Sequence, residues 1–240
     1  IQNFQLSKEE HEMEKIGKII KYALKTLFWL FIIAVNAIIL WRIFFSGDPS
    51  DIKKLTVNEN LAAAYEENGD LTLVRQKQRT ITSSGLFSVT DALYIPEAKQ
   101  VQIVVRYNNS TLRHLKEDFS LDEVPSREDD VFDVTLVKTI DLTPENTEDN
   151  ADENALREER FAPSEVKKEY KRLYSYRRFV FDDVTYDDAV GVFVDIYYNG
   201  ACDYGETPYG ALCIYDAEAD VTESRLGKSE RRALDAEKGK

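Results

Sequence analysis

The densest cluster of potentially reactive side chains in this sequence is a group of aspartates. Asp182-Asp183, Asp187-Asp188 and Asp195 follow one another closely along the chain. Oxygen ligands of this kind suit calcium, and two carboxylates can serve as the acid and the base of a glycosidase. The spacing matches no EF-hand loop, and such acidic pairs are typical of solvated turns. We therefore predict no metal, no cofactor and no catalytic residue. An enzyme that uses this acidic cluster is the alternative.

A catalytic nucleophile requires a neighbouring base, and histidine is scarce in this sequence. His114 is the single histidine of the distal region, and its setting beside Leu115 indicates a surface turn. The sequence contains neither a Walker motif nor a glycine-rich dinucleotide fingerprint. Asn108 and Asn109 each begin an N-x-Ser/Thr sequon, which matters only in a host that glycosylates secreted proteins. These residues favour a non-enzymatic function.

The two cysteines, Cys202 and Cys213, lie close together in the sequence. Two thiols are too few for a zinc site, which normally takes four ligands. The separation suits a local disulfide across a hairpin, and such a bond would require an oxidising compartment. Two buried free thiols are the alternative.

Tyrosines surround the cysteine pair. Because tyrosine offers a large contact area at low entropic cost, a stapled loop with exposed tyrosines would make a good recognition surface. The alternative is that these side chains pack over a small core. The tyrosines concerned are Tyr197, Tyr198, Tyr204, Tyr209 and Tyr215.

The sequence contains one long apolar run, which is expected to anchor the region that follows it. Residues 26–45 are almost entirely apolar, and twenty residues of helix measure roughly 30 Å, the thickness of a bilayer core. Trp29 and Trp41 lie toward the two ends of the run, as interfacial aromatics do. We predict a single-pass transmembrane helix that acts as an uncleaved signal anchor. Asn36, near its centre, predicts a helix–helix interface; the alternative is a bond to its own backbone.

The flanks of this helix predict its orientation. Residues 1–25 carry five lysines, against Arg42, Lys53 and Lys54 on the other side, so the N-terminus is expected in the cytoplasm. Residues 1–25 also resemble an amphipathic helix that begins with a capping box at Ser7. The large distal domain is then expected outside the cell membrane.

The distal region has the pattern of a mainly β domain. Alternating apolar residues and frequent turn signals predict seven short antiparallel strands, arranged as an immunoglobulin-like β-sandwich over residues 71–220. Val101, Ile103 and Val105 are expected on one face of their strand, with Gln102 on the other. The expected strands are 71–82, 85–94, 100–107, 131–142, 173–184, 190–198 and 210–216.

Other segments are expected to connect or to flank these strands. Residues 46–70 form a connector with a short helix near 61–65, and Ser110 caps another short helix. Residues 143–172 form a long acidic loop with a short helix at 164–170. Residues 221–240 form a flexible charged tail.

Charge limits the partners of the distal region. Residues 46–240 hold 25 lysines and arginines against 40 aspartates and glutamates, a net charge of −15. Such a domain repels phosphate backbones, which disfavours nucleic-acid binding. We predict a membrane-anchored, extracytoplasmic binding or assembly module with a protein partner or a second copy of itself. The alternative is a cell-surface hydrolase or carbohydrate-binding enzyme. The ligand is not identified by the sequence.

Overall fold

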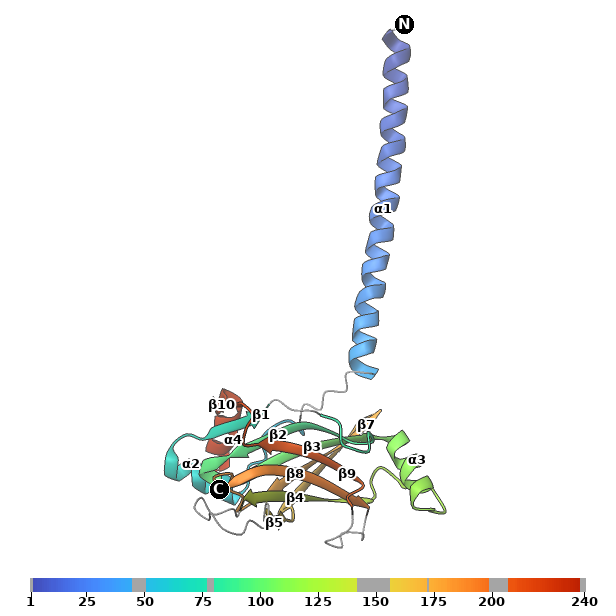
Figure 1. Cartoon of the computed structure of the whole chain (residues 1–240). Helices are drawn as coiled ribbons and strands as arrows, with labels where there is room; N and C mark the ends of the chain where they lie inside the picture. The colour runs from blue at the N-terminus through green and yellow to red at the C-terminus, as the bar shows by residue number, and fades with distance from the viewer. Residues whose placement is uncertain are drawn as a thin grey trace. The chain divides into compact units, whose positions relative to one another are not determined.

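The computed structural model describes residues 2–44, 51–76, 80–141, 156–171, 173–198 and 207–237 (Figure 1). The chain divides into two compact units, residues 1–48 and residues 49–240. Each unit is described by itself.

The first unit is a single helix, α1 (Gln2–Phe44). Its segment Ile20–Trp41 has 22 residues and is long and apolar enough to cross a membrane. The prediction of one apolar N-terminal helix is therefore confirmed, although the apolar stretch begins earlier than residue 26. The prediction of an N-cap at Ser7 was wrong, because the helix already begins at Gln2.

The second unit is mostly β and contains two antiparallel sheets. The six-stranded sheet has the order β10-β1-β2-β3-β7-β6, and the four-stranded sheet has the order β5-β4-β8-β9. An immunoglobulin-like arrangement of these strands is not confirmed. The strands are β1 (Thr72–Gln76), β2 (Ser88–Ile95), β3 (Gln100–Asn108), β4 (Phe132–Asp141), β5 (Leu156–Phe161), β6 (Glu165–Tyr170), β7 (Tyr174–Phe181), β8 (Ala189–Tyr198), β9 (Gly210–Asp216) and β10 (Val221–Arg225).

Three sequence-based predictions of local structure were wrong. Residues 164–170 were expected to be helical, but Glu165–Tyr170 pairs with β7 as an edge strand. Its two lysines are typical of an edge that resists further pairing. The tail was expected to be flexible, but it contains β10 and the helix α4 (Lys228–Glu237). The N-cap of α3 (Asn109–Asp118) is Asn108 and not Ser110, because the Asn108 side chain accepts a hydrogen bond from the Thr111 amide.

The two sheets share one apolar core. Val101, Ile103 and Val105 of β3 lie in the same cluster as Val192 and Val194 of β8. These residues are spaced two apart, so their side chains all project from one face of each strand. The alternation predicted for β3 is confirmed.

A second apolar cluster lies on the opposite face of the six-stranded sheet. Leu93 and Ile95 of β2 pack there with the helices α2 (Glu59–Asn68), α4 and the short helix η1 (Pro96–Ala98). Helix α2 ends at Gly69, which adopts a left-handed φ of 72° that favours glycine. The short helix expected near residues 61–65 is confirmed and is longer than predicted.

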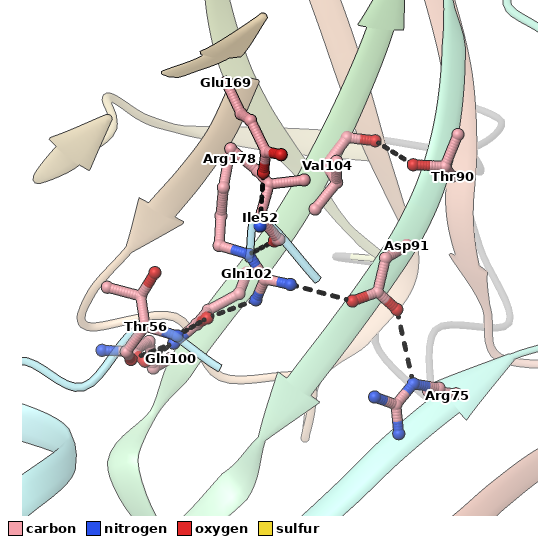
Figure 2. A network of polar contacts seen from close by, with 10 residues as sticks. All are labelled: Ile52, Thr56, Arg75, Thr90, Asp91, Gln100, Gln102, Val104, Glu169 and Arg178. Carbon is pink, nitrogen blue, oxygen red and sulfur yellow. Dashed lines mark hydrogen bonds and ion pairs between the residues drawn. The ribbon is translucent and has the colours of Figure 1, made fainter. Parts of the chain in front are cut away.

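The connector that precedes α2 is bound to the same face through a buried polar network (Figure 2). Arg178 of β7 donates hydrogen bonds to the Ile52 carbonyl at 2.7 Å and to Oε1 of Gln102 at 2.7 Å, and it pairs with Asp91 at 3.2 Å. Gln102 also exchanges hydrogen bonds with the backbone of Thr56, at 2.9 and 2.8 Å. The connector thus covers the outer face of β3 around Gln102, which is fully buried.

Arg178 and its acceptors should make a large contribution to stability. Arg178→Met is expected to lower the free energy of unfolding by about 3 kcal/mol, because it leaves buried acceptors without a donor and Asp91 without its buried partner. Urea denaturation of the full chain in detergent, followed by near-ultraviolet circular dichroism, would measure the change. Arg113→Met, at an exposed position on α3, is the matched control and should cost less than about 0.5 kcal/mol. Equal losses for the two variants would contradict a structural role for the network.

Candidate functional site

The outer face of the four-stranded sheet carries the candidate site. Along β8, Val192, Val194 and Ile196 enter the shared core, so the alternate residues Phe193 and Asp195 project outward. Pairing with β4 and β9 places Val137 and Cys213 directly beside Phe193. A row of side chains therefore runs across the sheet on its outer face.

These side chains line a groove of about 630 Å³. Its apolar surface includes Leu156, which is 56% exposed, and Val190, which is 43% exposed. Gly191 leaves room for the neighbouring ring, since a Cβ atom there would lie 3.0 Å from the Phe193 side chain. The lining residues are Val137, Thr139, Leu156, Glu158, Val190, Gly191, Phe193, Asp195, Cys213 and Asp216.

A chain of hydrogen bonds joins the two sides of this face. Arg160 of β5 donates to Glu158 at 2.8 Å and to the hydroxyl of Tyr197 at 3.1 Å. The Tyr197 hydroxyl in turn donates to Asp195 at 3.3 Å. Tyr197 is buried and shares the outer face of β8 with Asp195, because the two residues are spaced two apart.

Asp195 is the electrostatically unusual group of the groove. Its side chain is only 9% exposed. Burial raises the pKa of its carboxyl, while the hydrogen bond from Tyr197 and the charge of Arg160 oppose this shift in part. The arrangement places a carboxyl with a raised pKa at an apolar surface, where it can donate a proton or accept a cation.

Cys213 lies in the same groove as a half-buried free thiol. Its sulfur donates to the Tyr215 carbonyl at 3.1 Å. Burial raises the pKa of this thiol, which makes it a poor nucleophile at neutral pH. Cys202 lies outside the described residues, so the predicted disulfide is not confirmed.

The tyrosines predicted to form a recognition surface pack mainly against the core. Tyr198 stacks on Phe119 with ring centroids 4.2 Å apart, and Tyr215 packs on Tyr186 at 4.5 Å. Tyr209 makes an edge contact with Phe87, and its hydroxyl donates to Asp118. Tyr197 is buried, and Tyr204 lies outside the described residues. The structure therefore does not gather the four described tyrosines into one exposed surface.

The acidic cluster is dispersed by the fold. Asp182 accepts hydrogen bonds from Gln100 at 2.7 Å and from Ser164 at 2.5 Å. Burial acts to raise the pKa of Asp182, but these and other hydrogen bonds lower it overall. Asp188 pairs with the buried Lys138. Within the described part of the chain, no group of three side chains is placed to hold a metal ion.

Two further candidate residues, His114 and Asn36, contact neighbours on their own helices. His114 is exposed on α3 and lies 4.0 Å from Glu117, away from the groove. Asn36 donates a hydrogen bond to the Ile32 carbonyl of its own helix at 2.8 Å, which is the alternative that the sequence left open. Its amide donor therefore has a partner without a second helix.

Sequence reasoning found part of this site and missed the rest. Asp195 was singled out as a member of an acidic cluster for which no metal was predicted, and Tyr197 as part of a stapled loop. Phe193 shares their face by simple alternation, and that signal was available in the sequence. Glu158 and Arg160 were missed because the acidic composition around them predicted a loop instead of β5.

The chain was compared with protein-family models, with curated proteins and with solved structures, and it matches none of them. Its function must therefore be argued from the geometry of the groove.

The raised pKa of Asp195 predicts a particular dependence of stability on pH. The folded state holds this proton more tightly than the unfolded state, whose pKa is about 3.9. The stability that the protonated group supplies is full below about pH 4 and is lost as pH rises through the raised pKa. Asp195→Asn cannot ionise, so it should be more stable than the native chain at pH 7, by on the order of 1 kcal/mol.

Urea denaturation of the full chain at pH 7 and below pH 4 would test this prediction. The stabilisation should vanish in acid, where the native carboxyl is also neutral. Glu223→Gln, on the exposed strand β10, is the control and should change stability little at either pH. A loss of stability for Asp195→Asn at pH 7 would show that the charged carboxylate is the favoured form.

Proposed function

We propose that this chain is a membrane-anchored binding or assembly module. Its helix α1 spans the bilayer, and its distal domain docks a protein partner through the groove on the four-stranded sheet. The groove is the observation that carries this proposal. It exposes Leu156 and Val190 beside Phe193, and clustered apolar surface of this kind marks interaction sites in soluble domains.

Binding is favoured over catalysis by the groups that line the groove. Of the described lining residues, none is a histidine or a lysine that could activate the Cys213 sulfur as a nucleophile, and a disulfide to Cys202 would remove the thiol altogether. Asp195 is held by Tyr197, and Glu158 is held by Arg160. These pairings suit fixed recognition of a ligand more than the movement of protons.

A cell-surface hydrolase or carbohydrate-binding enzyme is the second candidate. It is favoured by one observation, because a buried carboxyl with a raised pKa and a second carboxyl, Glu158, line the same groove. Turnover of nitrophenyl glycosides that is abolished by Asp195→Asn would favour this candidate over a binding module.

We further propose that the distal domain lies on the extracytoplasmic side. The lysines of residues 1–25 support a cytoplasmic N-terminus. The proximity of Cys202 and Cys213 in the sequence supports a disulfide, which forms outside the cytosol.

The cysteine pair offers a direct test of this compartment. Slow labelling of native protein cannot distinguish a disulfide from a buried thiol of raised pKa, so the labelling should be done after unfolding. Protein from its native membrane, quenched in acid and unfolded in urea, should take up no maleimide at Cys202 and Cys213 until a reductant is added. Peptide mass spectrometry would locate the label. Labelling of both residues before reduction would overturn the disulfide and weaken the extracytoplasmic placement.

Docking at the groove can be tested by site-specific photo-crosslinking. A benzophenone-bearing amino acid at position 190 should form a covalent adduct with another polypeptide in the native membrane, because Val190 lines the groove. Position 221 on β10 is the matched control, since Val221 is 45% exposed and lies outside the groove. Gel shift and mass spectrometry would measure the adducts. Equal yields at the two positions, or none at position 190, would contradict the proposed docking surface.

A further inference from the structure

We propose that the groove takes a partner segment that places an apolar side chain over Phe193 and a lysine or arginine against Asp195. This inference rests on the proposed binding function and adds the chemistry of the occupant. Charge, hydrogen bonding and apolar surface within the groove each support one part of it.

The charged residues that line the groove are all acidic. Glu158, Asp195 and Asp216 are among the ten described lining residues, and none of the ten is a lysine, an arginine or a histidine. The distal region as a whole has a net charge of −15. Such a field steers basic partners toward the domain and disfavours acidic ones.

Asp195 can accept further hydrogen bonds from a ligand in the groove. Among the described residues, the side-chain hydrogen bond that it accepts comes from Tyr197, at 3.3 Å. An ionised carboxylate has two oxygens that can each accept more than one donor. The nearest cation of this hydrogen-bond chain, Arg160, is directed to Tyr197 and to Glu158. An ammonium or guanidinium group from a partner would supply a further donor as a charge-assisted hydrogen bond.

The apolar part of the groove excludes a purely basic occupant. Val137 and Phe193 line it, together with Leu156 and Val190, which are exposed. A charge pair in water contributes little, whereas the same pair contributes more once apolar side chains exclude water. The occupant should therefore carry apolar residues next to the basic one, and the methylene stem of that basic residue can lie along Phe193.

The experiment uses the full chain in nanodiscs of neutral phosphatidylcholine, so that the lipid does not attract cations. Three fluorescent peptides share the sequence Ser-Leu-Val-Xaa-Leu-Val-Ser, where Xaa is lysine, norleucine or glutamate. Fluorescence anisotropy would give each Kd, with empty nanodiscs as the blank. The lysine peptide should bind about tenfold more tightly than the norleucine peptide, and the glutamate peptide should bind most weakly.

Variants then assign the preference to the groove. Asp195→Asn keeps an acceptor for Tyr197 and should reduce the preference for lysine over norleucine to less than about twofold, through weaker binding of the lysine peptide. Glu158→Gln should reduce the preference in part and serves as a second variant. Glu223→Gln on β10 should leave all three Kd values unchanged, since it lies outside the groove.

The outcomes separate this inference from the function on which it rests. Equal binding of the three peptides, together with crosslinking from position 190, would overturn the basic occupant and leave the docking function standing. Absence of both peptide binding and crosslinking would overturn both. A crosslink from position 190 to a second copy of this chain alone, or dodecylamine that binds as tightly as the lysine peptide, would overturn the partner segment as the occupant.

Discussion

The guanidinium of Arg178 imposes the strongest constraint on the distal domain. It is buried on the outer face of the six-stranded sheet, where burial lowers its pKa and the charge of Asp91 opposes that shift. A cation in such a place must be surrounded by acceptors, since an unpaired buried charge is strongly destabilising. Its acceptors come from β2, from β3 and from the backbone of the connector at Ile52. If the connector separated from the sheet, the buried Arg178 would lose its hydrogen bond to the Ile52 carbonyl.

This constraint determines which surfaces of the domain remain free for a ligand. The six-stranded sheet is covered on one face by the shared core and on the other by the connector, α2 and α4. The four-stranded sheet also contributes one face to the core, but its other face carries the groove with exposed Leu156 and Val190. Arg177, next to Arg178, points the other way and stacks over Phe132 at 4.5 Å. The two arginines thus tie opposite faces of β7 to different parts of the chain.

Local patterns in the sequence predicted the elements well where they depended on neighbours along the chain. The alternation of Val101, Ile103 and Val105 gave the correct core face, and the short helix expected near residues 61–65 is present as α2. The burial of Gln102 was not predictable from the sequence. Its partner Thr56 lies 46 residues away and bonds it only through backbone atoms. Strand β10 was missed for a similar reason, since all its residues are exposed and its order comes from pairing with β1. Of the site, Asp195 could be named from sequence, but its apolar neighbours came together only through the pairing of β4, β8 and β9.

The bound connector and the groove belong to the same packed unit. The backbone of Thr56 is bound to Gln102 of β3, and the backbone of Ile52 is bound to Arg178 of β7. The same β3 contributes its other face to the core that supports β8 and, through β8, Phe193 and Asp195. The connector and the groove therefore lie on opposite sides of one packed unit, and the shared core between the two sheets joins them.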